Sequence, residues 1–291
     1  MKIRDILERE KFSLSFEFFP PKRDGNLENL YTAIRELILQ RPVFVSVTYG
    51  AGGGTREKTV EIASKVKNEF DQEVLAHLTC VQSSRDDIAR VIEELSAHNI
   101  ENILALRGDP PKDEEAFRRA PGGFGYASEL VEFIHTRGDF SIGVAGYPEG
   151  HIEAPSLEVD LDNLKKKVDA GAHFIITQIC FDNKHIYRFR DGAHARGIRV
   201  PIITGIFPIF NYRQIQRMAA LCGAKIPPSL HDKLDKVSEK DEEVQKYGIE
   251  FAIRQSEDLL ASDIAGLHFY SMNKSDHVLE ILREIQLPRE G

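Results

Sequence analysis

The sequence predicts an α/β protein with a (β/α)8 barrel, the TIM barrel fold, built as a single domain. Short β-rich runs alternate with helical patterns along the whole chain, and eight such pairs can be counted. Runs such as Phe-Ile-Ile-Thr-Gln (residues 174–178) lack polar alternation, which is typical of parallel strands buried on both sides. A chain of 291 residues, 42% of them hydrophobic, is long enough for one such barrel.

The first predicted strand covers residues 12–19, where small or polar residues alternate with large apolar ones. Ser13, Ser15 and Glu17 share one face of it, and the pair Pro20-Pro21 ends it. The other strands are expected at residues 43–48, 73–79, 102–106, 141–145, 174–179, 200–205 and 267–270.

A helix is expected after each strand. In residues 26–39, for example, apolar side chains recur at the spacing of one helix face. The later helices are expected at residues 58–70, 84–98, 126–136, 157–170, 184–196, 211–221 and 276–285, with extra helical segments at 227–262 before the eighth strand.

Composition excludes several classes of function. The net charge of -8 argues against broad nucleic-acid or anionic-membrane binding, which requires basic surface. No apolar run approaches the roughly 20 residues of a membrane span, and no signal sequence is visible, so a cytoplasmic protein is expected. Three cysteines, Cys80, Cys180 and Cys222, fit reduced thiols better than a disulfide framework.

Polar residues follow almost every predicted strand at its carboxyl end, where barrel enzymes carry their active sites. Glu17 is notable because a carboxylate among phenylalanines is costly to desolvate in its charged form, so it could donate a proton near neutral pH. The alternative is an edge-strand Glu that faces solvent or pairs with an Arg. The full set is Glu17, Thr48, His77, Thr79, Arg107, Asp109, Tyr147, His151, Gln178, Tyr270 and Lys274.

Two further motifs have simpler interpretations. Residues 50–55, Gly-Ala-Gly-Gly-Gly-Thr, suggest a dinucleotide fingerprint, but Thr55 stands in place of the third glycine and the barrel pattern favours a loop. His77-x-x-Cys80 suggests zinc, but the paired ligand spacing of known sites is missing, so no metal is expected.

Seven motifs in register resemble the methylenetetrahydrofolate reductase family, in its bacterial single-domain form. They are Ser-Phe-Glu-Phe-Phe-Pro-Pro-Lys (15–22), Phe-Val-Ser-Val-Thr-Tyr-Gly (44–50), His-Leu-Thr-Cys (77–80), Leu-Arg-Gly-Asp (106–109), Gly-Tyr-Pro-Glu-Gly-His (146–151), Ile-Thr-Gln (176–178) and His-Phe-Tyr (268–270). The resemblance implies one FAD-binding barrel over residues 1–291 that passes hydride from NADH or NADPH, through FAD, to 5,10-methylenetetrahydrofolate. The product is 5-methyltetrahydrofolate.

The resemblance also assigns roles on the substrate side. Glu17 matches the family's general acid, which opens the five-membered folate ring by protonating a bridging nitrogen. Asp109 matches an aspartate near flavin and pterin, where a carboxylate can accept two pterin N–H groups; the alternative is a turn opener before two prolines. Gln178 matches a pterin contact, or is a core Gln satisfied by backbone. Gln214 and Lys274 match further folate contacts, although relatives commonly carry Arg at the position of Lys274.

For FAD, the resemblance implies a wall of charged and aromatic residues. Lys166, Lys167 and Arg107 can offset diphosphate charge, and Tyr147 offers an aromatic surface. The alternative is a solvated helix face, and position 166 is often Arg in relatives. The set is Thr48, His77, Arg107, Gly108, Asp109, Tyr126, Ala127, Tyr147, His151, Asp160, Asn163, Lys166 and Lys167.

Two other classes of function stay open at this point. One is a flavin-free pterin-binding barrel that transfers a one-carbon group, and the other is a non-catalytic subunit of a larger complex. The electron donor is not encoded in a visible motif; NADH is expected by analogy with single-domain relatives, which commonly form homo-oligomers. Because the chain ends soon after the last helix, no second domain and no response to S-adenosylmethionine are expected.

Overall fold

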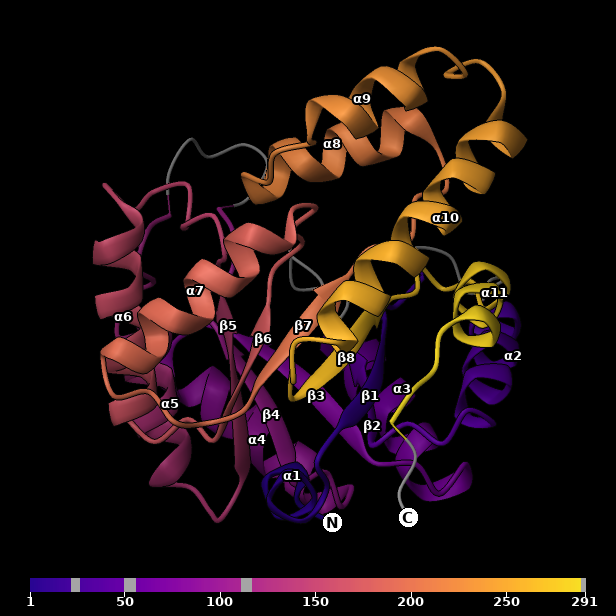
Figure 1. The fold of residues 1–291 in the computed structure, drawn as a ribbon. Helices are drawn as coiled ribbons and strands as arrows, with labels where there is room; N and C mark the ends of the chain where they lie inside the picture. The colour runs from indigo at the N-terminus through magenta and orange to yellow at the C-terminus, as the bar shows by residue number, and fades with distance from the viewer. Residues whose placement is uncertain (22–26, 50–55, 111–116, 289–291) are drawn as a thin grey trace.

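The computed structural model describes residues 1–21, 27–49, 56–110 and 117–288, and within these ranges the strands form one closed parallel barrel (Figure 1). Neighbouring strands follow chain order, and the last strand pairs with the first, Ser13 opposite Gly266 and Glu17 opposite Tyr270. The strands are β1 (Ser13–Phe18), β2 (Phe44–Val47), β3 (Val74–Thr79), β4 (Asn102–Leu106), β5 (Ser141–Gly146), β6 (Phe174–Thr177), β7 (Ile202–Ile206) and β8 (Gly266–Tyr270). The predicted barrel fold is therefore confirmed.

The helices surround the barrel, as the apolar spacing predicts. They are α1 (Ile3–Arg9), α2 (Leu27–Ile38), α3 (Arg56–Glu69), α4 (Arg85–Ala97), α5 (Ala127–His135), α6 (Leu157–Asp169), α7 (Asn183–Ala195), α8 (Tyr212–Cys222), α9 (Pro228–Asp235), α10 (Asp241–Leu260) and α11 (Asp276–Glu284). The extra segments before β8 are α9 and α10, and Figure 1 shows α8 and α9 above one end of the barrel. None of the described helices is long and apolar enough to cross a membrane.

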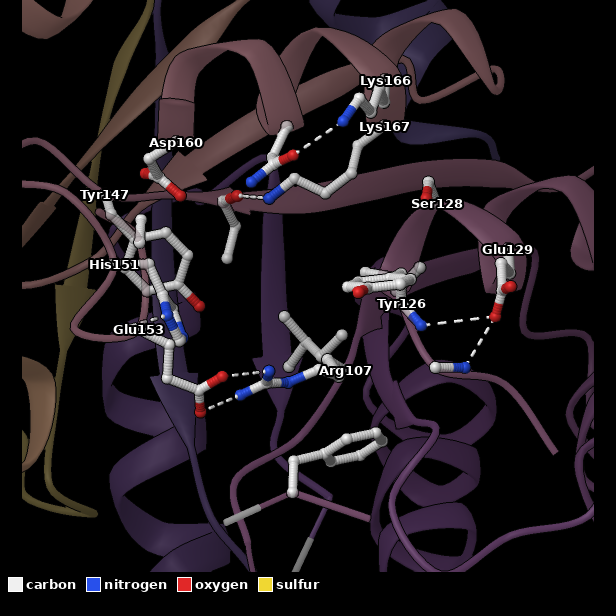
Figure 2. Close-up of a pocket in the computed structure, with 18 of the residues that line it drawn as sticks. Arg107, Tyr126, Ser128, Glu129, Tyr147, His151, Glu153, Asp160, Lys166 and Lys167 are labelled. Atoms are coloured by element: carbon white, nitrogen blue, oxygen red, sulfur yellow. Dashed lines mark hydrogen bonds and ion pairs between the residues drawn. The ribbon is translucent and has the colours of Figure 1, made fainter. Parts of the chain in front are cut away.

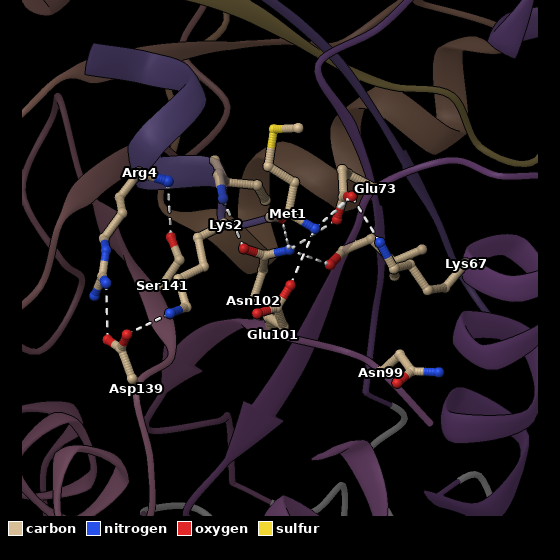
Figure 3. Close-up of polar contacts among 12 residues, drawn as sticks. Met1, Lys2, Arg4, Lys67, Glu73, Asn99, Glu101, Asn102, Asp139 and Ser141 are labelled. Atoms are coloured by element: carbon tan, nitrogen blue, oxygen red, sulfur yellow. Dashed lines mark hydrogen bonds and ion pairs between the residues drawn. The ribbon is translucent and has the colours of Figure 1, made fainter. Parts of the chain in front are cut away.

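Helix α1 is the element that the sequence did not predict, and it closes the opposite end of the barrel. Ile3 and Leu7 pack against the interior side chains Phe44, Leu104 and Phe174. Polar strand residues satisfy the first backbone N–H groups of this helix, which have no intrahelical acceptor (Figure 3). Ile3 N donates to Asn102 Oδ1 at 2.8 Å, and Arg4 N donates to Ser141 Oγ at 3.0 Å.

The barrel interior changes character along its axis. Beside α1 it is filled by apolar side chains, whereas the inward face of β1 carries Ser13 and Ser15, both fully buried, and then Glu17. Because side chains alternate across a strand, the predicted shared face of these three residues points into the barrel. The outward faces of the strands pack against the helices in the largest apolar cluster. Polar groups thus gather at the carboxyl end.

Candidate active site

A cavity of about 990 Å³ opens at the carboxyl ends of β4 and β5, between α5 and α6 (Figure 2). This volume is at the upper end of the usual range for ligand sites, about 300–1,000 Å³. Most residues expected to bind FAD line it together: Arg107, Tyr126, Ala127, Tyr147, His151, Asp160, Asn163, Lys166 and Lys167. These residues, which the family resemblance implied, therefore form one continuous surface.

The α6 wall of the cavity combines a buried carboxylate, that of Asp160, with the half-buried side chain of Lys167. Asp160 is only 7% exposed, and burial raises its pKa. Lys167 donates from Nζ to the carbonyl oxygen of Ala145 at 2.5 Å, and burial lowers its pKa to about 8 despite the nearby Asp160. The alternative of a solvated helix face is therefore wrong for these two residues, while Asn163 and Lys166 are exposed and hydrogen-bonded to each other.

The loop after β5 supplies an aromatic wall. The rings of Tyr147 and His151 meet edge to face with centroids 4.7 Å apart. Burial, and next the charge of Asp109, raises the pKa of Tyr147, so its hydroxyl stays protonated. Burial and then Arg107 lower the pKa of His151, which keeps this imidazole neutral at pH 7. The wall is therefore uncharged.

Arg107 does not present a free positive charge to the cavity. Its two terminal nitrogens bind both carboxylate oxygens of Glu153, at 2.6 and 2.7 Å, and its guanidinium stacks over Phe117 at 4.8 Å from the ring centroid (Figure 2). Sequence reasoning missed Glu153, because a pair separated by 46 residues leaves no periodic signal. The pair fixes Arg107 and neutralises part of its charge.

The first turn of α5 forms the facing wall. Glu129 Oε2 accepts from the backbone N–H groups of Gly125, at 2.6 Å, and Tyr126, at 3.4 Å. This contact caps the helix by binding the N–H groups of the N-cap residue, Tyr126, and of the residue before it. Tyr126 itself is 68% exposed, so its ring is accessible from the cavity.

Glu17 lies near the carboxyl end of β1, between two histidines. Its Oε2 is 3.5 Å from His77 Nε2 of β3 and 3.6 Å from His268 Nε2 of β8, and its side chain is 19% exposed. Since β1 pairs with a strand on both sides, the alternative of an edge-strand Glu is wrong. Burial lowers the pKa of His77 to about 4, so this imidazole is neutral at pH 7.

Tyr270 lies next to Glu17, on the neighbouring strand β8. Its hydroxyl donates to the carbonyl oxygen of Thr177 at 2.7 Å, and its ring lies against Gly205, where a Cβ would approach the ring to 2.7 Å. Burial raises its pKa well above the usual value, and the next causes are Glu17, Cys222 and Tyr147. These groups therefore lie within electrostatic reach of one another across the barrel mouth.

Comparison with known proteins decides the family. The sequence model described as methylenetetrahydrofolate reductase matches residues 2–286. The chain belongs to the methylenetetrahydrofolate reductase family.

Individual relatives agree with this family. The chain is 41% identical over 301 residues to methylenetetrahydrofolate reductase (NADH) 1 of Arabidopsis thaliana, covering 100% of this chain and 51% of the plant protein. It is 37% identical over 266 residues to 5,10-methylenetetrahydrofolate reductase of Escherichia coli, covering 91% of this chain and 88% of that protein. The chain thus spans about half the length of the plant relative and most of the bacterial one.

A solved structure supports the barrel fold. A Clostridium thermocellum protein described as binding two copies of 5-methyl-5,6,7,8-tetrahydrofolic acid superposes with a TM-score of 0.64 at 14% identity, covering 97% of this chain and 96% of that one. At 14% sequence identity, this similarity supports the fold alone.

The remaining residues that the reductase family would assign lie around the barrel mouth rather than in the cavity wall. Asp109 is exposed and follows Gly108, whose φ of 87° and whose contact with Val81 exclude a side chain there. Thr48 directly follows β2, and His77 lies within β3. Neither residue lines the cavity. Their distance from its walls was not visible in the sequence.

Three residues expected to bind folate are also outside the cavity. Gln178 is half-buried, and its Oε1 accepts from Ile179 N at 2.8 Å, so it is not a fully buried core glutamine. Gln214 lies in the first turn of α8. Lys274 is exposed, with Nζ 5.4 Å from the Phe210 ring centroid.

The glycine-rich motif and the His77-x-x-Cys80 motif are considered separately from the site residues. The glycine-rich segment 50–55 lies outside the described residues, as do Lys22 and Pro111. Cys80 donates from Sγ to the carbonyl oxygen of Leu106 at 3.4 Å and belongs to the core outside the barrel, whereas His77 faces Glu17 inside it. Within the described ranges no group of three or more potential metal ligands was found.

Proposed function

We propose that this chain catalyses the FAD-dependent reduction of 5,10-methylenetetrahydrofolate to 5-methyltetrahydrofolate, with NADH or NADPH as electron donor. The observation that carries the proposal is the position of Glu17, a partly buried carboxylate between two histidines at the mouth of a barrel of this family. The name of the plant relative, which specifies NADH, favours NADH as the donor.

The residues present fit a bound FAD. The cavity provides two lysines for a diphosphate, aromatic rings at Tyr126 and Tyr147, and the carboxylate of Asp160 for ribose or adenine donors. Thr79 Oγ1, at the end of β3, is buried without a hydrogen-bond partner among the described residues, and His77 Nε2 makes no hydrogen bond there beyond its 3.5 Å contact with Glu17. Buried polar atoms normally have partners, so these two atoms are available to a ligand. When bound, FAD would supply the hydride.

Glu17 supplies the proton in this proposal. A neutral carboxylic acid donates to a bridging nitrogen of the folate, the carbon–nitrogen bond opens, and an electrophilic iminium remains on the substrate. The low pKa of His77 supports this role, because a neutral imidazole offers no positive charge to hold Glu17 as a carboxylate.

The folate itself would be held by groups at the mouth. Asp109 can accept two adjacent pterin donors, and Gln178 can use its amide N–H groups, since its oxygen already binds Ile179 N. Gln214 and Lys274 are available for the remainder of the folate. An ammonium group in place of the guanidinium that relatives commonly carry would bind a carboxylate as a point charge rather than a fork.

The first experiment is a visible absorption spectrum of the purified protein, followed by anaerobic addition of NADH and then NADPH. A flavin spectrum that is bleached by either nucleotide and restored by 5,10-methylenetetrahydrofolate is the expected result. A flavin that neither nucleotide reduces would mean a protein partner as electron source. A colourless protein that cannot be reconstituted with FAD would overturn the reductase and favour the flavin-free one-carbon transferase.

A further inference from the structure

We propose that His268 is a positioning residue that holds Glu17 in its neutral form, and that Ser15 fixes the imidazole tautomer required for this. In this arrangement Nδ1 of His268 carries the proton and donates to Ser15, so that the lone pair of Nε2 faces the acid proton of Glu17. The inference rests on the proposed function only for the role of Glu17 as an acid. The tautomer itself can be measured independently.

The imidazole of His268 is held on every side. It is 0% exposed, its ring stacks on Phe44 with centroids 5.9 Å apart, and the ring of Tyr270 meets it edge-on at 5.5 Å. Its Nδ1 is 2.8 Å from Ser15 Oγ, and β1 and β8 are paired at this position. The ring therefore cannot turn to exchange its two nitrogens without disrupting the barrel interior.

The surroundings of Ser15 favour one direction for the hydrogen bond. Ser15 Oγ is 3.4 Å from the carbonyl oxygen of Leu267, to which its hydroxyl donates. A hydroxyl has one proton, so once that proton points to Leu267 the oxygen is an acceptor for Nδ1–H of His268. A neutral imidazole protonated at Nδ1 has an acceptor at Nε2.

Two potential donors face Nε2 of His268. Ser46 Oγ lies 3.5 Å away, and Glu17 Oε2 lies 3.6 Å away. The one lone pair of Nε2 can accept from a hydroxyl or from a protonated carboxyl group, whereas a carboxylate there would face that lone pair without a proton between them. Catalytic hydrogen bonds often tighten when substrate binds, so the longer distance to Glu17 is compatible with this contact.

The other groups facing Glu17 add no positive charge that would hold it as a carboxylate. His77 of β3 is neutral at pH 7, Tyr270 of β8 keeps its proton, and burial raises the pKa of Cys222 at the end of α8 to about 12. Within the described ranges neither Lys nor Arg forms an ion pair with Glu17. Of the two imidazoles that face Glu17, His268 is the one whose other ring nitrogen has a hydroxyl partner, Ser15, at 2.8 Å.

The direct test is nitrogen NMR of the full-length protein labelled with ¹⁵N-histidine. His268 is identified by the signal that disappears in His268→Asn and moves in Ser15→Ala. We expect a protonated Nδ1 and an unprotonated Nε2 near neutral pH. A protonated Nε2, or a doubly protonated ring, would overturn the proposal whether or not the protein is a reductase.

The functional test compares Ser15→Ala with Ser13→Ala. Ser13 is on the same face of β1, is also 0% exposed and has no hydrogen-bond partner within the described ranges, so its removal controls for the loss of a buried hydroxyl. Without Ser15 Oγ, Nδ1–H has no acceptor, the proton moves to Nε2, and Nε2–H then stabilises the Glu17 carboxylate.

The measured quantity is the pH dependence of reoxidation of the reduced flavin by 5,10-methylenetetrahydrofolate. The rate is expected to fall with rising pH as Glu17 loses its proton. In Ser15→Ala this fall should occur about one pH unit lower, so that the reaction is about tenfold slower than in the unaltered protein on the alkaline side. Ser13→Ala should keep the original profile. An unchanged profile in Ser15→Ala, with NADH still reducing the flavin, would overturn the role of His268 and leave the proposed function intact. Absence of a reducible flavin in the unaltered protein would instead overturn the proposed function.

Discussion

At the scale of single residues, Glu17 combines partial burial with two imidazole neighbours and forms no ion pair with Lys or Arg among the described residues, which is an arrangement for transferring a proton. We expect Glu17→Gln to keep the size and hydrogen bonding of the side chain while removing the proton. Reoxidation of the flavin by the folate should slow by roughly 10²–10⁴-fold, and reduction by the nucleotide should be preserved. Stopped-flow measurement of each half-reaction separates the two steps. Equal losses in both would make Glu17 a structural residue.

Lys167 gives a prediction about pH. Its folded pKa of about 8 lies below the usual 10.5, so its charged fraction falls as pH rises through 8. If the cavity holds the FAD diphosphate, FAD affinity should weaken between pH 7 and 9, measured by flavin fluorescence. Lys167→Gln should weaken binding at pH 7 and remove this pH dependence. The control is Lys165→Gln on the same helix, since Lys165 pairs with Asp169. The same pH dependence in both variants would assign it to another group.

The limits of sequence reasoning are visible at the same residues. Glu17 was identified because an acid among phenylalanines at a strand end is locally anomalous, whereas Asp160 and Lys167 of α6 were implied only by the family resemblance. Glu153 and the acceptor role of Glu129 were missed. Glu153 acts through Arg107, which is 46 residues away and which only the fold brings close. The contact of Glu129 with Gly125 and Tyr126 is local, and a capping pattern in the sequence could have indicated it.

At the scale of elements, the eight strands and the helices that follow them were predicted from periodicity, whereas α1 was not. This helix has seven residues, too few for intrinsic stability, and it depends on Asn102 and Ser141 for its first N–H groups. Strand β6 ends at Thr177, two residues before the predicted end, where the Gln178 side chain binds the next backbone N–H. The contacts of α1 with Asn102 and Ser141 are long-range, and the contact of Gln178 with Ile179 is between adjacent residues; neither kind produces a period in the sequence.

Helix α1 should contribute to stability without contributing to the site. Ile3 is 0% exposed and fills the closed end of the barrel, so Ile3→Ala should lower the free energy of unfolding by about 2–5 kcal/mol. The flavin spectrum and the Glu17 half-reaction should be unchanged at temperatures where the variant is folded. Leu39→Ala is the control, since Leu39 is 78% exposed and should change stability by less than about 0.5 kcal/mol. Urea unfolding of both variants gives the comparison, and equal effects would mean that α1 is not part of the cooperative core.

At the scale of the whole molecule, the residues that stabilise the barrel and the residues of the candidate site lie at opposite ends of its axis. Apolar residues and α1 close one end, while titratable groups and the cavity occupy the other. Residues at the end that carries the candidate site include buried polar atoms without hydrogen-bond partners within the described ranges, such as His77 Nε2 and Thr79 Oγ1. Such groups reduce the stability of the protein until a ligand satisfies them.

Ligand binding should therefore stabilise the whole barrel, and the size of the ligand should matter. Free FAD at about 100 times its dissociation constant should raise the free energy of unfolding by about 2.7 kcal/mol. Riboflavin lacks the diphosphate and the adenosine that the α6 wall would hold, so at the same concentration it should stabilise far less. Thermal unfolding followed at several concentrations of each ligand measures the difference. Equal stabilisation by riboflavin would show that the isoalloxazine ring alone binds tightly, and that Asp160 and Lys167 line a cavity the cofactor does not use.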